Sequence, residues 1–395
     1  MDLVTFRNLL SPAGREVLQA ATELQPGEDD FLRHFTTLSR HYPVELARLA
    51  LGIATLRKQA ERKFPFANQL YFTREALEQS SSWEVSSYRA LRYRGFSHLL
   101  DLGCSVGADT LALAQIAPTS GLDLDPLRLA MAQANLAALG LGSSSSLIQA
   151  DLQSPLPFSS TPSPPALFFD PARRESFRRI FSVSAYRPPL AMVKEWLPRF
   201  PALGVKISPG VDLNELAGYD AELEFISLNG DLKEAILWFG PLQNAYRRAT
   251  LLPSRHTLSI DARQETRLAI DEPRAYLYEP DPAVLRAGLV AMLGAQLNAV
   301  QLDPDIAYLT TSEHISTPFA RAWNVEAWFP FGLKRLRAYL RQHNVGRVTV
   351  KKRGSPLEPE ALIRDLRLSG DKERTIFLTH LQGKPIVVIG WKADD

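Results

Sequence analysis

The segment Leu99–Thr110 constrains the fold of this chain more than any other part of the sequence. It reads LLDLGCSVGADT, so an apolar run ending in Asp101 leads to Gly103 and Gly107 and then to an apolar helical pattern. This order predicts a buried strand, a tight turn and the first turn of a helix. A glycine turn there lets a ligand approach the backbone beside the positive end of the helix. Because Ser105 lies between the glycines, the spacing differs from the G-x-G-x-x-G pattern of dinucleotide-binding turns.

The composition is that of a soluble globular protein with more than one domain. A chain of 395 residues, 45% hydrophobic and 22% charged, is too long for one ordinary core. No apolar run reaches the roughly 18 residues of a membrane helix, and the first residues lack the pattern of a signal peptide. Cys104 is the only cysteine, which excludes an internal disulfide and a cysteine-based zinc or iron–sulfur site. We therefore expect a cytoplasmic protein with no membrane contact and no metal.

The first two thirds of the chain divide into a helical part and an alternating part. Apolar residues at helical spacing predict helices over residues 1–75. Strand and helix patterns then alternate over 76–250, which predicts a doubly wound α/β domain with a parallel sheet. The turn Asn229-Gly230-Asp231 predicts that the last two of its strands pair antiparallel. The strands are expected at 97–102, 120–124, 147–150, 166–169, 202–207, 222–228 and 234–239.

The composition changes near residue 250, where Leu251–Ser254 has the pattern of a linker. Beyond it we expect an α+β region, divided into a small segment over 251–310 and a terminal domain over 311–395. Helices are expected at 282–293 and 333–343. The strands are expected at 255–260, 275–278, 347–352, 375–381 and 385–391.

Four acidic residues follow successive strands of the predicted parallel sheet: Asp101, Asp123, Asp151 and Asp170. In an open α/β sheet, ligands bind beyond the carboxyl ends of the strands. Asp123 comes about 20 residues after the glycine turn, which suits the hydroxyls of a ribose, and Asp151 could accept a hydrogen bond from an adenine amino group. A single aspartate at such a place is more often a cap or turn residue. Four in order favour an adenosine site.

These motifs resemble those of class I S-adenosylmethionine-dependent methyltransferases over about residues 70–245. The resemblance implies a Rossmann-like sheet of seven strands, the last one antiparallel, and S-adenosylmethionine as the cofactor. The family's turn has a third glycine where this chain has Ser105. The residues that the resemblance assigns to the cofactor are Asp101, Gly103, Cys104, Ser105, Gly107, Asp109, Asp123 and Asp151.

The sequence Asp170-Pro171-Ala172-Arg173 is similar to the Asp/Asn-Pro-Pro-aromatic motif of enzymes that methylate amino groups. The likeness implies catalytic roles for Asp170, Pro171 and Arg173. A carboxylate and a nearby carbonyl accept the two N–H bonds of the amine, which positions its lone pair toward the methyl group. Arg173 replaces the aromatic residue that stacks on the target base; it could stack on a base, bind an anion, or face solvent beside Arg174. Lys206, at the end of another predicted strand, could form an ion pair or contact substrate.

A narrower resemblance extends over nearly the whole chain, to a bacterial family of methyltransferases with a THUMP-like C-terminal domain. It implies a helical N-terminus, a catalytic domain, a ferredoxin-like segment and a THUMP-like unit. THUMP domains bind RNA, so structured RNA such as tRNA or rRNA is the implied partner. The matching segments are Phe72–Glu75, Tyr88–Ala90, Val205–Gly210, Leu228–Glu234, Tyr278–Pro282 and Val350–Gly354.

Basic residues gather between Gly332 and Arg353. The segment holds eight Lys and Arg and no acid, although the net charge of the whole chain is only +2. Such a cluster suits a phosphate backbone, while the alternatives are a solvated basic face or salt bridges to the Glu358–Asp365 segment. The residues that we predict to bind RNA are Lys334, Arg337, Arg341, Lys351, Lys352 and Arg353.

The sequence therefore predicts an S-adenosylmethionine-dependent methyltransferase that N-methylates an exocyclic amino group of an RNA base. Two alternatives stay open. The chain could be a non-catalytic RNA-binding protein that retains the fold, or a methyltransferase for a small molecule or a protein side chain.

Overall fold

The computed structural model describes residues 1–27, 29–158, 163–172, 174–175, 178–179, 182–263 and 267–393. The chain divides into two compact units. The first unit comprises Met1–Glu222 and Glu234–Asn244, and the second comprises Leu223–Lys233 and Ala245–Asp395. In the part of the chain that is described, no helix is both long and apolar enough to cross a membrane.

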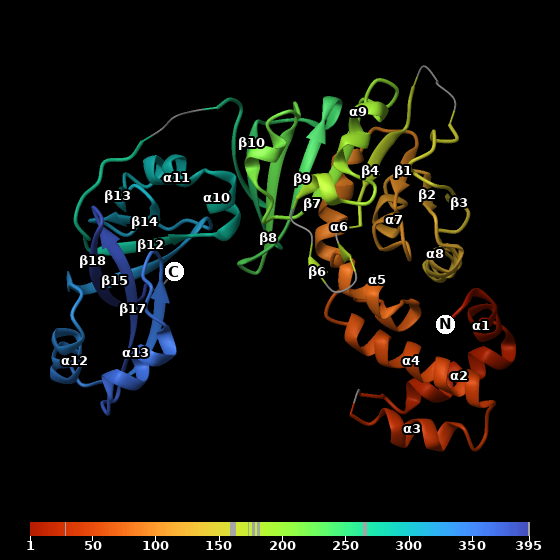
Figure 1. The fold of residues 1–395 in the computed structure, drawn as a ribbon, viewed down its shortest axis with the longest axis horizontal. Helices are drawn as coiled ribbons and strands as arrows, with labels where there is room; N and C mark the ends of the chain where they lie inside the picture. The colour runs from red at the N-terminus through yellow and green to blue at the C-terminus, as the bar shows by residue number, and fades with distance from the viewer. Residues whose placement is uncertain are drawn as a thin grey trace. The chain divides into compact units, whose positions relative to one another are not determined.

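The N-terminus of the first unit is helical, as predicted (Figure 1). Side chains cap the first two helices: Asp2 accepts a hydrogen bond from the Thr5 amide, and Ser11 accepts one from the Gly14 amide. The apolar faces of these helices meet in a core that includes Leu9, Val17 and Leu51. The helices are α1 (Leu3–Leu9), α2 (Pro12–Glu23), α3 (Phe31–Leu38), α4 (Val44–Ala60), α5 (Arg74–Gln79) and α6 (Trp83–Ala90).

A mainly parallel sheet forms the rest of the first unit, with its strands in the order β9-β7-β4-β1-β2-β3. Strand β1 lies between β2 and β4 and is parallel to both, so the direction of winding reverses there. Ligands of doubly wound sheets bind at this switch point. The last strand, β9, runs antiparallel to β7, as expected. The strands are β1 (Leu99–Leu102), β2 (Thr119–Asp123), β3 (Ser145–Gln149), β4 (Ala166–Phe169), β7 (Leu203–Ile207) and β9 (Asp231–Phe239).

Short elements complete this unit. The helices α7 (Ala108–Leu113), α8 (Pro126–Ala138) and α9 (Val193–Trp196) accompany the sheet, and β5 (Arg174–Glu175) pairs with β6 (Arg178–Arg179). Six of the seven predicted strands lie in this unit. The seventh, β8 (Glu222–Leu228), runs into the second unit.

The predicted linker at 251–254 is wrong, because these residues belong to a hairpin of the second unit. Strand β10 (Arg247–Leu252) runs parallel to β8 and antiparallel to β11 (His256–Ile260). Leu251 and Leu252 are buried in β10, and a turn through Pro253 and Ser254 leads to β11. Pro253 and Ser254 do form a turn, but it joins two paired strands of one sheet rather than two domains.

A seven-stranded sheet forms the main part of the second unit, in the order β13-β14-β12-β15-β18-β17-β16. This one sheet contains strands from both predicted parts of the C-terminal region, 251–310 and 311–395. The division of the chain into four domains stays a prediction. Three of the strands, β13 to β15, were not predicted. The strands are β12 (Tyr276–Pro280), β13 (Val300–Asp303), β14 (Ile306–Thr311), β15 (Ala320–Pro330), β16 (Val345–Lys352), β17 (Lys372–Leu381) and β18 (Lys384–Lys392).

Helices accompany this sheet. The helix expected at 282–293 is two helices, because Gly288 adopts a left-handed conformation with φ of 73° and ends the first one. Leu336 and Leu340 of α12 pack with Leu362 and Leu366 of α13 in a core that also holds residues of β16, β17 and β18. The helices are α10 (Pro282–Ala287), α11 (Val290–Gln296), α12 (Leu333–Gln342) and α13 (Pro359–Leu366).

Candidate functional site

The glycine turn after β1 packs against the segment that follows β4. The backbone φ is 83° at Gly103 and 81° at Gly107, a conformation that glycine adopts without strain. A Cβ atom on Gly103 would lie 3.0 Å from the carbonyl oxygen of Asp170. Ser105 also has positive φ, 51°, at a cost of about 1 kcal/mol for a residue with a side chain. The turn therefore brings the ends of β1 and β4 into direct contact.

Asp123, at the end of β2, is bonded to this turn. Its Oδ2 accepts a hydrogen bond from the Ser105 amide at 2.8 Å, and its Oδ1 accepts one from the Asp125 amide at 2.9 Å. Each carboxylate oxygen can accept a second hydrogen bond, and the side chain is half-buried rather than enclosed. Asp123 therefore holds the turn and keeps acceptor capacity for a ligand.

Asp101 is 1% exposed and carries an unsatisfied oxygen. Its Oδ2 accepts a hydrogen bond from the Thr110 hydroxyl at 2.6 Å, whereas its Oδ1 has no partner among the described residues. Burial, followed by the nearby Asp109 carboxylate, raises the pKa of Asp101 to about 8. Because an unpaired buried carboxylate oxygen is costly, this atom is suited to a ligand group that donates a hydrogen bond.

Asp109 lies in a buried ion-pair network. Its carboxylate pairs with the guanidinium of Arg89 on α6, which also donates to Glu234 Oε1 on β9 at 2.8 Å. The Arg89 side chain is 2% exposed and stacks over the ring of Phe168, 4.6 Å from its centroid. Sequence interpretation gave Arg89 and Glu234 no role, because 145 positions separate them. The network ties the first turn of α7 to α6 and β9.

Asp170, at the end of β4, forms an ion pair with Lys206 on the adjacent strand β7. Lys206 Nζ donates to Asp170 Oδ2 at 2.7 Å; the lysine side chain is 3% exposed and the aspartate side chain 22%. The sequence leaves two roles open for Lys206, an ion pair or a contact with substrate. The structure shows the ion pair. Pro171 is buried beside Asp170, and Arg173 lies outside the described residues.

Asp151 and Cys104 are the other predicted cofactor residues. Asp151 is exposed, and its Oδ1 accepts a hydrogen bond from the Gln153 amide at 2.9 Å, the arrangement of a turn residue. Cys104 is buried in the turn, and burial raises the pKa of its thiol well above the usual value. The structure thus brings together Asp101, Gly103, Cys104, Ser105, Asp123 and Asp170, while Asp151 lies exposed after β3.

No group of three or more His, Cys, Asp or Glu side chains is placed to hold a metal ion within the described ranges.

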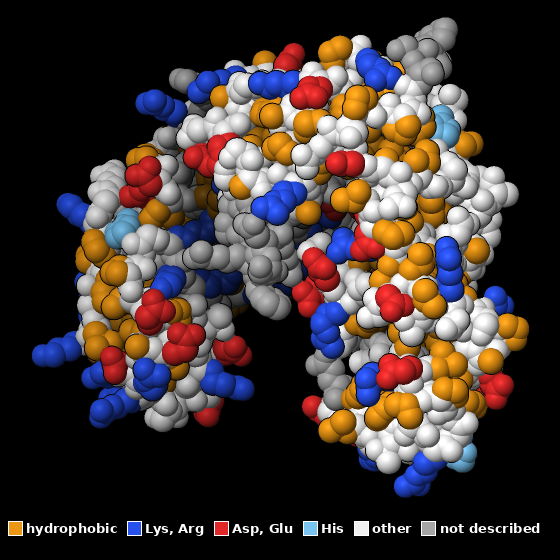
Figure 2. Space-filling model, turned by 45° about the vertical axis from the view of Figure 1, so that its right-hand side comes forward, with side chains coloured by type: hydrophobic (Ala, Val, Ile, Leu, Met, Phe, Trp, Pro, Cys, Tyr) orange, Lys and Arg blue, Asp and Glu red, His pale blue; other side chains and the backbone are white. Residues whose placement is uncertain are grey.

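Most of the basic residues predicted to bind RNA have partners inside the second unit. Arg337 and Arg341 donate to the backbone carbonyls of Asp365 and Arg367. On the face shown in Figure 2, Lys and Arg lie among Asp and Glu rather than in one continuous patch.

The end of the basic cluster is paired with acids. Lys351 and Arg353 lie against Glu279, with 3.6 Å between Arg353 Nη2 and Glu279 Oε1. Lys352 pairs with Glu358 at 2.7 Å, which fits the salt-bridge alternative for this cluster. Lys334, in contrast, is exposed at the start of α12.

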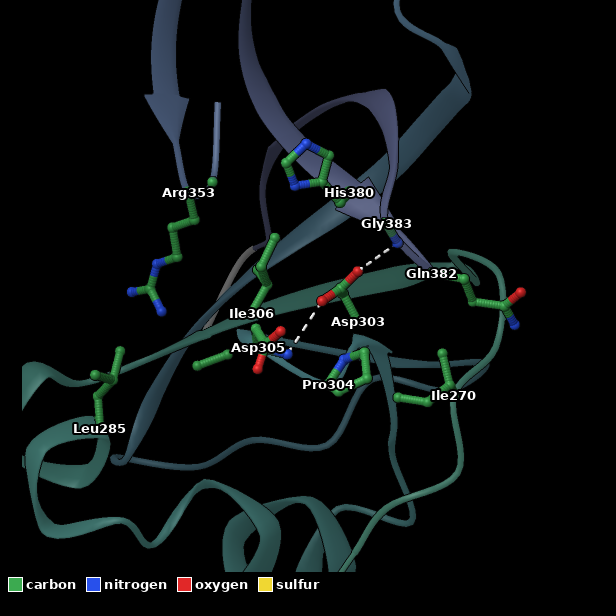
Figure 3. Close-up of a pocket in the computed structure, with 12 residues that line it drawn as sticks. Ile270, Leu285, Asp303, Pro304, Asp305, Ile306, Arg353, His380, Gln382 and Gly383 are labelled. Carbon is green, nitrogen blue, oxygen red and sulfur yellow. Dashed lines mark hydrogen bonds between the residues drawn. The ribbon is translucent and has the colours of Figure 1, made fainter. Parts of the chain in front are cut away.

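A pocket of about 1110 Å³ lies in the second unit (Figure 3). Arg353 lines it together with His380 and Asp305. Asp303 has a structural role in the wall of the pocket, because its two oxygens accept hydrogen bonds from the amides of Asp305 and Gly383. With two carboxylates, one guanidinium and one imidazole, the lining has no excess of positive charge for a phosphate.

Comparison with known proteins shows relatives over most of the chain. This chain is 35% identical over 321 residues to uncharacterized S-adenosylmethionine-dependent methyltransferases of two Mycobacterium tuberculosis strains. The match covers 80% of this chain and 86% of each relative. A crystal structure of a proposed methyltransferase from Porphyromonas gingivalis W83 has a TM-score of 0.80 and 24% identity. It covers 96% of this chain and 99% of that one, which shows a shared fold.

Two family models match parts of the chain. Residues 320–392 match a THUMP domain-like family, and residues 2–60 match a domain of unknown function. The first match lies in the seven-stranded sheet and its helices α12 and α13. The second lies in the N-terminal helices.

Proposed function

Because the chain belongs to the family of S-adenosylmethionine-dependent methyltransferases, we propose that it methylates an exocyclic amino group of an RNA base. S-adenosylmethionine is the cofactor. The observation that carries the proposal is the contact between the glycine turn at Gly103 and the backbone of Asp170. It joins the predicted cofactor segment to the predicted acceptor motif at the switch point of the sheet.

The residues of the first unit fit the cofactor. The unpaired Oδ1 of Asp101 would accept from the ammonium group of the methionine part, and Asp123 would accept from the ribose hydroxyls. The turn from Gly103 to Gly107 leaves room for close approach to its backbone. Asp151 would bind the adenine amino group from its exposed position, and Asp109 and Cys104 would position the turn from within the fold.

Asp170 would hold the acceptor amine. Lys206 occupies its Oδ2, so Oδ1 and a neighbouring backbone carbonyl remain to accept the two N–H bonds. The ammonium group of Lys206 balances the charge of Asp170 and fixes the orientation of its carboxylate. The sulfonium of the bound cofactor supplies an electrophilic methyl group. Positioning of the amine is then the main contribution of these residues to the rate.

The match of residues 320–392 to a THUMP domain-like family supports RNA as the substrate class. The basic helix α12 supports it as well, because its four Lys and Arg side chains meet no acid on the same helix. Because Lys351, Lys352 and Arg353 at the end of β16 are held in ion pairs, we expect the RNA contacts on this helix instead.

The test uses extract from cells that lack this gene, incubated with the purified protein and methyl-labelled S-adenosylmethionine. We expect label in material that ribonuclease degrades and protease does not. Asp170→Ala should leave this material unlabelled, since the acceptor amine loses its carboxylate. Label that resists ribonuclease would favour a small molecule or protein side chain, and no label with intact cofactor binding would favour a non-catalytic RNA-binding protein.

A further inference from the structure

Strand β18 ends in an exposed aromatic side chain. Trp391 is 43% exposed, and it is the one exposed Phe, Tyr or Trp side chain in the part of the chain that the structure describes. Tryptophan is usually buried for most of its surface. A single exposed apolar side chain needs no explanation by itself, so the neighbours of this indole decide what it can do.

Arg374 on β17 fixes this indole in place. Its guanidinium carbon lies 5.0 Å from the Trp391 ring centroid, within cation–π range. Its Nε donates to a carboxylate oxygen of Glu326 on β15, which fixes the position of the guanidinium. The arginine thus orients the indole while much of the ring stays open to solvent.

Helix α12 continues the same surface. Arg335, Tyr339 and His343 follow one another at intervals of four residues, which places them along one stripe of the helix. The rings of Tyr339 and His343 stack with centroids 4.0 Å apart, and Arg335 lies over the ring of Phe329 at 4.5 Å. The Tyr339 ring also packs against Phe329 of β15, with centroids 5.6 Å apart, so the stripe lies on the strand whose Glu326 binds Arg374.

The charge of this surface is positive. Arg335 and Arg374 contribute two guanidinium groups against the single carboxylate of Glu326. Lys334 is exposed beside them, and α12 contains no acidic residue. Aromatic rings beside excess positive charge are the combination that binds unpaired bases and their phosphates.

We propose that Arg335, Tyr339, His343, Arg374 and Trp391 form a stacking surface that binds unpaired bases of single-stranded RNA. The proposal rests on the proposed function for its choice of RNA, and it adds which form of RNA the second unit holds. Bases in a duplex are covered by their neighbours and present no free face to an indole. The stacking surface therefore selects unpaired nucleotides.

The experiment measures binding of the full-length protein to fluorescein-labelled oligouridine by fluorescence anisotropy, with an RNA duplex of equal length as the second probe. Trp391→Ala should weaken oligouridine binding roughly tenfold or more, because stacking on an aromatic ring is lost. Trp391→Phe should restore most of the affinity. Arg347→Ala, which removes an exposed charge from β16 outside the surface, should weaken it far less.

Circular dichroism checks that each variant is folded, and Trp391→Leu replaces Trp391→Ala if the alanine variant is unstable. Equal affinity of wild type and variant, preference for the duplex, or no binding of oligouridine would each overturn the stacking surface. Methyl transfer to cellular RNA is measured on the same samples. If wild-type protein labels RNA while Trp391 has no effect, the stacking surface alone is wrong; if it labels no RNA, the proposed function is wrong.

Discussion

The three aspartates at the ends of β1, β2 and β4 lie in three different surroundings. Asp101 is enclosed with one unsatisfied oxygen, Asp123 is bonded to two backbone amides, and Asp170 is paired with a lysine. These surroundings suit the different roles that we propose for the three side chains. The unsatisfied oxygen of Asp101 suits an ammonium group, and the remaining acceptor capacity of Asp123 suits hydroxyl groups. The carboxylate of Asp170, neutralised by Lys206, suits an amine that must stay uncharged to react.

Asp123→Ala is expected to lower affinity for S-adenosylhomocysteine at least tenfold. The variant loses the proposed acceptor for the ribose and the two hydrogen bonds that hold Ser105 and Asp125, each worth roughly 1 kcal/mol or more. Isothermal titration calorimetry measures the effect. Asp125→Ala is the matched control, because it removes the cap of α8 and keeps the backbone amide that Asp123 binds. Equal affinity of the two variants would contradict the role of Asp123.

Binding of S-adenosylhomocysteine is expected to release close to one proton at pH 7. The pKa of Asp101 is raised to about 8, so its carboxyl group is mostly protonated at pH 7 in the free protein. An arriving ammonium group favours the ionised form, and the proton leaves. Release should fall above pH 8, where the free carboxyl group is already ionised.

Calorimetry in buffers of different ionisation enthalpy counts these protons. Asp101→Asn has no carboxyl group to titrate and should bind with little release. The same proton count in wild type and Asp101→Asn would show that another group titrates.

Asp170→Ala is expected to retain binding of S-adenosylhomocysteine and to lose methyl transfer roughly 100-fold or more. Lys206→Met should lose less activity, because the carboxylate remains but its orientation and charge balance change. Filter assays with labelled cofactor and cellular RNA give the rates. Activity of Asp170→Ala close to wild type would place the acceptor site elsewhere.

At the scale of elements, the glycine turn joins two strands through a contact that a side chain would block. Gly103→Ala forces a Cβ toward the Asp170 carbonyl at a φ that disfavours it, and should lower the free energy of unfolding by roughly 1–3 kcal/mol. Gly140→Ala is the control, since Gly140 has φ of 71° and a Cβ added there would meet nothing within 4 Å. Urea unfolding compares them. Only Gly103→Ala should also weaken cofactor binding; an equal loss of stability in both would contradict the contact.

Elements were predictable from the sequence where the pattern is local. The strand β1 and the turn at Gly103 follow from apolar spacing and glycine. Strand β15 was missed because a bulge between Val325 and Ala327 breaks its alternation. The pattern at Leu251–Ser254 predicts a linker where β10 ends, because this strand is stabilised by pairing with β8 and β11, which no local signal reports.

At the scale of the whole molecule, the sequence predicted which acids follow the strands but not what they pair with. Lys206 lies 36 positions from Asp170, and Glu279 lies 72 positions before Lys351. A count of basic residues along the sequence leaves out the acidic residues that folding brings beside them. This is why the predicted RNA-binding residues at 351–353 are largely neutralised, while α12 keeps its charge.

The central claim is that the first unit transfers a methyl group to a base amine of RNA. Mass spectrometry of nucleosides tests it most directly, after RNA from cells lacking the gene is incubated with the protein and isotope-labelled S-adenosylmethionine. We expect one nucleoside labelled on an exocyclic nitrogen, absent with Asp170→Ala. Label on a ribose oxygen or a base carbon, or no labelled nucleoside at all, would contradict it.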